Sequence, residues 1–106
     1  IIREEDGLAK SSRNTYLSEK ERTAALCLSR AVKAGQATIC KGIKAEEVLA
    51  KMRGIIEAEP LAKIDYVSMV DALDMQPVEI VEKDVLVAMA VYIGKTRLID
   101  NFSYEV

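Results

Sequence analysis

One stretch decides the fold: Val85-Leu86-Val87-Ala88-Met89-Ala90-Val91-Tyr92-Ile93, the longest apolar run in the chain. A continuous apolar run rich in β-branched residues predicts a β-strand, and we expect this strand to be covered on both faces. The run has only about half the length that a membrane-spanning helix needs. Gly94-Lys95 follows, and a two-residue loop with glycine first fits a type II′ hairpin. The sequence therefore predicts that residues 85–93 pair antiparallel with a final strand over residues 96–102.

Two amphipathic helices are predicted before this hairpin. Ser18 and Glu21 form an S-x-x-E pattern, a capping box that begins a helix. An apolar face follows, and Gly35 marks the expected end of this first helix. A second helix is predicted over residues 45–59, because Pro60 cannot continue it. The apolar faces consist of Ala24, Leu28, Ala31 and Val32 in the first helix and of Val48, Leu49, Met52, Ile55 and Ile56 in the second.

The order of the elements indicates an α+β fold. Residues 64–71 form a further predicted strand, and residues 72–84, with Pro77 and several carboxylates, are predicted to be a loop. Two helices followed by three strands favour a small antiparallel three-stranded sheet packed with helices on one side. A length of 106 residues fits a single domain with one core.

Composition excludes several classes of function. The net charge of −2 argues against a nucleic-acid-binding surface. Cys27 and Cys40 are too few for a disulfide scaffold or a zinc site, and Cys27 is predicted to be a packed thiol rather than a reactive one. The chain has no histidine, so a complete acid–base active site is not expected within these residues. The start of the chain shows no signal-peptide pattern, so we expect a cytoplasmic protein.

The segment from Asp6 to Asn14 is dense in hydrogen-bond donors and has little apolar surface to bury. Its serine hydroxyls and backbone N–H groups can surround phosphate oxygens, and Lys10 and Arg13 can neutralise their charge. The alternative interpretation is a solvated loop whose polar residues serve the next helix. The residue types by themselves leave both interpretations open.

The final predicted strand contains further polar residues. Arg97, Asp100 and Asn101 are candidates for a functional role, but we interpret them as solvent-facing residues or as residues that fix the edge of the sheet. Gly94-Lys95-Thr96 is similar to the end of a Walker A motif. That motif requires a glycine where Met89 stands, so a P-loop is excluded.

Two blocks of the sequence resemble the pantothenate synthetase (pantoate–β-alanine ligase) family. The blocks lie at opposite ends of the chain and in the family's order, so the resemblance covers nearly all of it. The first block is similar to the family's interdomain loop and following helix, and the second to its closing segment. The first reads Arg3-Glu4-x-Asp6-Gly7-Leu8-Ala9-x-Ser11-Ser12-Arg13-Asn14-x-Tyr16-Leu17-Ser18 with Glu21-Arg22, and the second Tyr66-Val67, Asp71 and Gly94-Lys95-Thr96-Arg97-Leu98-Ile99-Asp100-Asn101.

The resemblance implies a reaction and a set of site residues. The family joins D-pantoate to β-alanine through pantoyl adenylate, converting ATP to AMP and pyrophosphate. Its Ser-Ser-Arg loop is the analogue of the KMSKS loop in class I aminoacyl-tRNA synthetases. By this resemblance Ser11, Ser12 and Arg13 bind the ATP phosphates, with Arg13 catalytic, while Lys10 and Ile2 contact the nucleotide largely through the backbone. Mg²⁺ would arrive with ATP, and no residue here is a convincing metal ligand.

The resemblance also implies a division into domains. Residues 1–17 would be the interdomain, phosphate-binding loop, and residues 18–106 the body of a C-terminal lid. The family's Rossmann-like N-terminal domain, with its H-x-G-H motif, is missing from this sequence. That domain carries most pantoate and ATP contacts and the homodimer interface, so the present chain alone is expected to be inactive. The alternative is a stand-alone binding module in which the Ser-Ser-Arg loop is only a connector.

Overall fold

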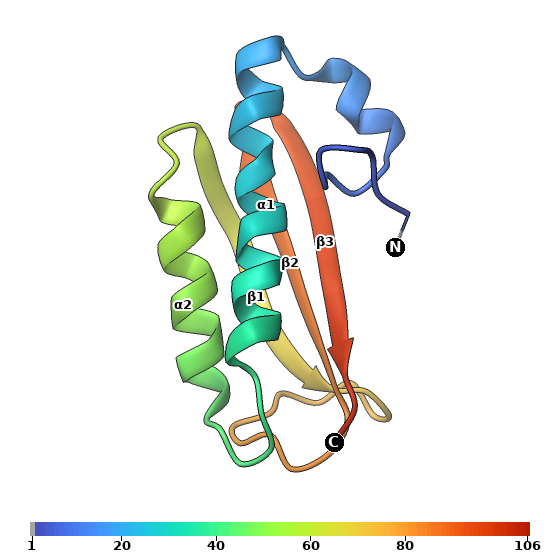
Figure 1. Cartoon of the computed structure of the whole chain (residues 1–106), viewed down its shortest axis with the longest axis vertical. Helices are drawn as coiled ribbons and strands as arrows, with labels where there is room; N and C mark the ends of the chain where they lie inside the picture. Colours follow the sequence, from blue (N-terminus) through green and yellow to red (C-terminus); the bar gives the residue numbers. More distant parts are fainter. Residues whose placement is uncertain (1) are drawn as a thin grey trace.

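The protein folds into two layers, with two helices against one face of a three-stranded sheet (Figure 1). The structure is a computed structural model that describes residues 2–106. Its elements are η1 (Ser12–Tyr16, a short 3₁₀ helix), α1 (Glu19–Thr38), α2 (Ala45–Glu57), β1 (Ala62–Asp71), β2 (Val85–Ile93) and β3 (Thr96–Tyr104). This arrangement confirms the predicted α+β class. Within residues 2–106, no helix is both long and apolar enough to span a membrane.

The sheet has the order β1-β2-β3, and both neighbouring pairs are antiparallel. The predicted hairpin is present, because Ile93 pairs with Thr96 across Gly94-Lys95. Gly94 has a φ of +62°, whereas the φ of Lys95 is not positive, as a type II′ turn requires. The predicted strands are confirmed, and the first and last are each two residues longer than expected.

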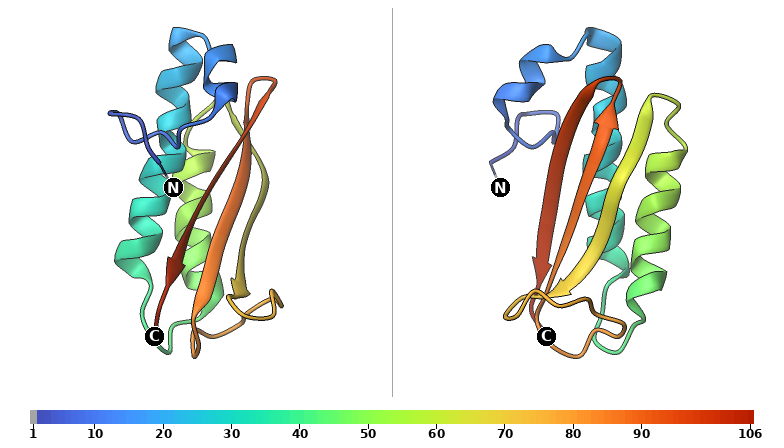
Figure 2. Two further views of the ribbon diagram at one scale, coloured as in Figure 1. Left: turned by 90° about the vertical axis from the view of Figure 1, so that its right-hand side faces the viewer. Right: turned by 180° about the vertical axis from the view of Figure 1, so that it is seen from behind.

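The expectation that β2 is covered on both faces is wrong. Alternate residues of the strand lie beneath the helices and are buried: Val85, Val87, Met89, Val91 and Ile93. Between them, Leu86 and Ala88 are partly exposed, Tyr92 is exposed and Ala90 is buried. Views from the side and from behind show both helices on the same face of the sheet (Figure 2). We call the other side the open sheet face, which carries Tyr66, Leu86, Ala88, Ala90, Tyr92, Arg97, Ile99 and Asn101. On this face Ala88 and Ala90 continue the apolar run, but their side chains are small enough to need no second layer of helices over them.

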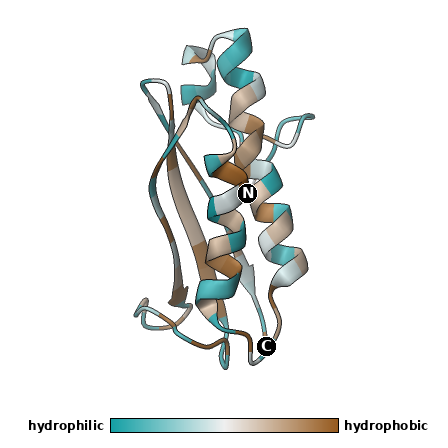
Figure 3. Ribbon diagram, turned by 90° about the vertical axis from the view of Figure 1, so that its left-hand side faces the viewer, coloured by the Kyte–Doolittle hydropathy of each residue, from teal (hydrophilic) through white to brown (hydrophobic). Residues whose placement is uncertain are grey.

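Helix α1 begins as predicted and ends later than predicted. Ser18 and Glu21 form the capping box in both directions. The helix continues through Gly35 to Thr38. Gly35 does not end the helix but allows other side chains to pack closely against it. A Cβ atom at Gly35 would lie 2.8 Å from Sδ of Met52 and 3.0 Å from the ring of Phe102. Both helices alternate hydrophobic and hydrophilic residues along their length (Figure 3), so each has one face suited to the core.

Replacing Gly35 by valine should destabilise the protein by about 1–3 kcal/mol, because the added methyl groups overpack the contact with Met52 and Phe102. Gly54→Val is the matched control, since a Cβ at Gly54 of α2 meets no atom within 4 Å. Urea unfolding measures both variants. Equal midpoints for the two variants would contradict a packing role for Gly35.

Cys27 is fully buried in α1, which confirms the packed thiol, and Cys40 is exposed. Burial raises the pKa of the Cys27 thiol to about 11. Since the thiolate is the reactive species, Cys27 should resist modification at pH 8. We expect an aromatic disulfide reagent to label one thiol in the native protein and two in urea. Rapid labelling of both thiols under native conditions would show that α1 opens locally.

Candidate functional site

Residues 2–10 fold back on themselves as a tight loop beside β3. Arg3 pairs with Ala9 in an isolated antiparallel bridge, and the N–H of Lys10 donates to the carbonyl of Ile2 at 2.8 Å. Gly7 turns the chain with a φ of +95°, a conformation that glycine adopts without strain. The next residue, Leu8, is buried in the core. The loop therefore has an apolar anchor in the domain.

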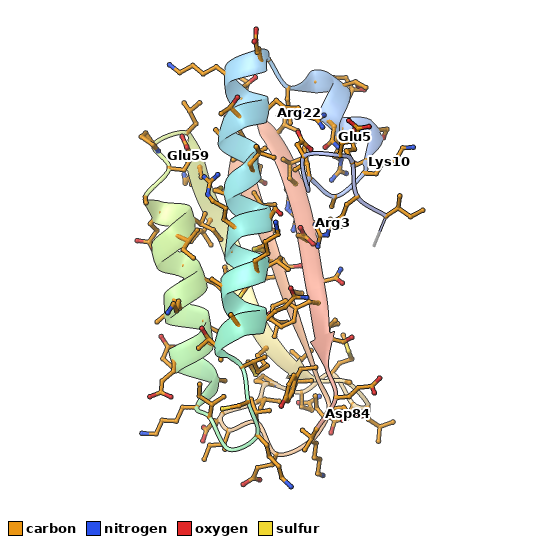
Figure 4. All side chains as sticks on the ribbon, in the orientation of Figure 1. Arg3, Glu5, Lys10, Arg22, Glu59 and Asp84 are labelled. Carbon is orange, nitrogen blue, oxygen red and sulfur yellow. The ribbon has the colours of Figure 1, made fainter. Side chains whose placement is uncertain are left out.

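A forked ion pair joins this loop to the edge strand. Nη1 and Nη2 of Arg3 donate to the two carboxylate oxygens of Asp100, each at 2.8 Å, and Nη1 also donates to the carbonyl of Gly7 at 3.0 Å. The side chain of Asp100 is 1% exposed and that of Arg3 is 30% exposed. Figure 4 shows Arg3 between the loop and β3. Asp100 is thus a buried carboxylate that depends on a partner from the loop.

A second polar network joins the loop to α1. Arg22 reaches from α1 toward the loop (Figure 4) and forms ion pairs with Asp6 and Glu4 at 3.1 and 3.2 Å. The side-chain amide of Asn14 donates to Glu4 and to the carbonyl of Ala9. A hydrogen bond from Asn14 and one from Arg22 lower the pKa of Glu4, and hydrogen bonding to Arg22 lowers the pKa of Asp6. Both loop carboxylates, Glu4 and Asp6, are therefore paired on the side of the loop that faces α1.

A hollow of about 460 Å³ lies on the other side, between the loop and β3, and we call it the loop–strand hollow. Lys10 and Arg13 supply its positive charge, whereas Arg97, which also lines it, directs its guanidinium across the sheet to Asp65 of β1. None of the described residues that line the hollow is a carboxylate. A neighbouring hollow shares Lys10 but also contains Glu4. Of these two hollows, the loop–strand hollow has the charge that suits an anion. Its lining is Leu8, Ala9, Lys10, Ser11, Ser12, Arg13, Arg97, Leu98, Ile99 and Asn101.

The structure brings together four of the five residues predicted to contact ATP. Lys10, Ser11, Ser12 and Arg13 all line the loop–strand hollow, whereas Ile2 does not and is 76% exposed. The N–H of Lys10 is already bonded to Ile2, so a backbone contact from Lys10 to a nucleotide would have to use another atom. In the part of the chain that the structure describes, the N–H groups of Ser11 and Ser12 have no protein acceptor. The role of these residues in ATP binding stays a prediction.

The hollow also contains residues of β3 whose role the sequence did not establish. Arg97 and Asn101 were interpreted as solvent-facing or edge-fixing residues. The ion pair of Arg97 with Asp65 of β1 agrees with that interpretation, and both residues also line the hollow. Asp100 does fix the edge, through Arg3. The available signal was the two-residue spacing of Arg97, Ile99 and Asn101, which places them on one face of a strand. What the sequence lacked was the position of the loop beside that face.

Metal ligands are not apparent at this site. Among residues 2–106, no group of three or more His, Cys, Asp or Glu side chains could hold a metal ion. Lys10 and Arg13 would repel a cation from the hollow. These residues do not fit a resident metal, and the arrival of Mg²⁺ with ATP stays a prediction.

Comparison with known proteins identifies the family. The family model described as pantoate-beta-alanine ligase matches residues 1–103. The chain belongs to this family. It is 57% identical over 105 residues to a pantothenate synthetase of Ruminiclostridium cellulolyticum, covering 98% of the chain and 37% of that protein. It is 54% identical over 106 residues to the pantothenate synthetase of Clostridioides difficile, covering 99% of the chain and 38% of that protein.

A solved member of the pantoate–β-alanine ligase family shares the fold. The crystal structure of pantothenate synthetase from Thermus thermophilus superposes with a TM-score of 0.86 at 35% identity. The match covers 95% of this chain and 37% of that one. The chain therefore spans little more than a third of the length of the relatives that it matches.

Arg3→Met should destabilise the chain by about 2–3 kcal/mol, because it leaves the buried carboxylate of Asp100 without its cation. Arg53→Met is the matched control, since Arg53 pairs with the exposed Glu46 on α2 and such surface pairs contribute about 0–1 kcal/mol. Urea unfolding compares the two. A similar loss in both variants would mean that the Arg3–Asp100 pair does not anchor the loop.

Proposed function

We propose that this chain is the C-terminal lid of a pantoate–β-alanine ligase and that its loop–strand hollow binds the phosphates of ATP. The observation that carries the proposal is the charge of that hollow: Lys10 and Arg13 line it together with two serines, and none of the described residues that line it is a carboxylate. Family membership supplies the reaction class. The remaining pantoate, ATP and β-alanine contacts, and the homodimer interface, are proposed to belong to an N-terminal domain.

The proposed reaction has two steps. A carboxylate oxygen of D-pantoate attacks the α-phosphorus of ATP, the bond from that phosphorus to the β-phosphate oxygen breaks, and pyrophosphate leaves with the electron pair. The amine of β-alanine then attacks the acyl carbon of pantoyl adenylate, and AMP leaves after the amine loses a proton. Negative charge builds on the departing pyrophosphate in the first step, so fixed cationic donors at that position accelerate it.

In this scheme the arginine and the serines of the loop contribute different hydrogen bonds to the phosphates. Arg13 has a planar guanidinium that can donate to two phosphate oxygens at once, and the serine hydroxyls add neutral hydrogen bonds. Nη1 of Arg13 lies 3.4 Å from the carbonyl of Arg97, so its guanidinium is directed toward β3 and the hollow. Ser11 accepts a hydrogen bond from the N–H of Arg13, which links the conformations of neighbouring site residues. A closing lid would also exclude water from the adenylate.

Arg13→Ala in the complete ligase should lower kcat for AMP release by about 100-fold or more, because it removes a donor to the developing phosphate charge. The measurement is AMP release that depends on both pantoate and β-alanine. Arg30→Ala is the control, since Arg30 is an exposed residue of α1 outside the hollow.

Three outcomes separate the possibilities. A large loss in Arg13→Ala with an unchanged unfolding curve supports the phosphate site. Equal kinetics for both variants would leave the loop as a connector and overturn the site assignment. Absence of pantoate-dependent AMP release in the unaltered enzyme would overturn the proposed reaction and favour a non-catalytic binding module.

A further inference from the structure

Asn14 is the buried residue of the loop segment that holds Ser11, Ser12 and Arg13. Of the five residues of η1, Asn14 alone is buried, at 7% exposure, whereas Arg13 beside it is exposed. We propose that Asn14 is a positioning residue, whose side-chain amide ties the two ends of residues 10–13 together and so holds Arg13 at the loop–strand hollow. This inference rests on the proposed function and adds to it a residue that acts through Arg13.

Hydrogen bonds from Asn14 close residues 10–13 into a ring. Its side-chain Nδ2 donates to the carbonyl of Ala9, the residue just before the segment, at 3.0 Å. Its backbone N–H donates to the carbonyl of Ser11 at 3.1 Å, and the N–H of Arg13 donates to Oγ of the same serine at 3.2 Å. The four residues of the ring are themselves exposed. Asn14 therefore fixes the backbone of the segment while its side chains stay accessible to a ligand, and such preorganised donors are the ones that stabilise developing charge.

The chemistry of the two partners requires an amide at position 14. Nδ2 of Asn14 also donates to Oε2 of Glu4, so both partners of this nitrogen are acceptors. The other side-chain atom, Oδ1, is buried and has no hydrogen-bond partner among the described residues. The side chain thus keeps its two donor bonds although its acceptor is left unsatisfied, which costs free energy. An aspartate of the same shape would place an oxygen against both Ala9 and Glu4.

Glu4 connects Asn14 to the body of the domain. The same Oε2 atom of Glu4 that accepts from Asn14 also pairs with Nη1 of Arg22 on α1, at 3.2 Å. The ring is therefore held to a long helix as well as to the loop. Arg13, the next residue along, extends from this fixed backbone toward β3, where its Nη1 lies 3.4 Å from the carbonyl of Arg97.

Asn14→Asp in the complete ligase should lower kcat for AMP release by about 10- to 100-fold, because repulsion from Ala9 and Glu4 displaces Arg13. Gly35→Val is the matched control. It is expected to destabilise the fold through Met52 and Phe102, which do not line the hollow, so it should keep its kcat. An equal loss of kcat in both variants would mean that Asn14 contributes only to stability, and the inference would be wrong.

A double-mutant cycle tests whether Asn14 acts through Arg13. Asn14→Ala should lower kcat in the unaltered enzyme but add little further loss in the Arg13→Ala enzyme, because the group that it positions is already gone. Losses that multiply in the double variant would show that Asn14 acts independently of Arg13 and would overturn the inference.

Trypsin gives a readout that does not depend on activity, because Lys10 lies in the ring and is exposed. Asn14→Ala should speed cleavage after Lys10 in the folded enzyme by about 5- to 30-fold, the loss of one or two hydrogen bonds. Faster cleavage with unchanged kcat would make Asn14 purely structural and contradict the proposal. Unchanged cleavage and kcat in Asn14→Ala, with kcat still lost in Arg13→Ala, would overturn this inference and leave the proposed function in place. Full activity of Arg13→Ala would instead overturn the phosphate site itself, and the positioning role with it.

Discussion

The buried carboxylate of Asp100 is the constraint on which the site depends. Asp100 lies on the helix side of the edge strand β3, where water is excluded, and a carboxylate there requires a cation and hydrogen-bond donors. Arg3 supplies two N–H groups and the N–H of Asn101 supplies a third. Because Arg3 comes from the N-terminal loop, satisfying Asp100 brings the loop against β3. The loop–strand hollow is the space that remains between them.

The loop separates its charges onto two sides. Glu4 and Asp6 turn toward α1, where Arg22 and Asn14 are their partners, while Lys10 and Arg13 line the hollow beside β3. A chain with a net charge of −2 thereby presents a locally cationic surface. Pairing the carboxylates elsewhere matters as much as placing the cations, because a carboxylate in the hollow would cancel one of them.

The sequence predicted those features that depend on local pattern. The capping box at Ser18, the glycine-first hairpin at Gly94 and the apolar run of β2 each depend on near neighbours in the chain, and all three are present. It failed where distant residues decide the outcome. By its type Gly35 predicts the end of a helix, and only the packing of Met52 and Phe102 against it shows why a glycine lies within the helix. The apolar run suggested two covered faces, because alanines on an open face cannot be distinguished from buried ones by type alone.

The same distinction applies to the candidate site. Lys10, Ser11, Ser12 and Arg13 are adjacent in sequence, so their common location followed from the motif, although their function stays a prediction. Arg97 lies 84 residues from Arg13, and its backbone carbonyl meets the Arg13 side chain where the Arg3–Asp100 pair holds the loop at that edge of the sheet. A substitution that releases the loop would separate the two arginines while leaving both in the sequence. The geometry of the hollow therefore depends on a structural ion pair that does not itself line it.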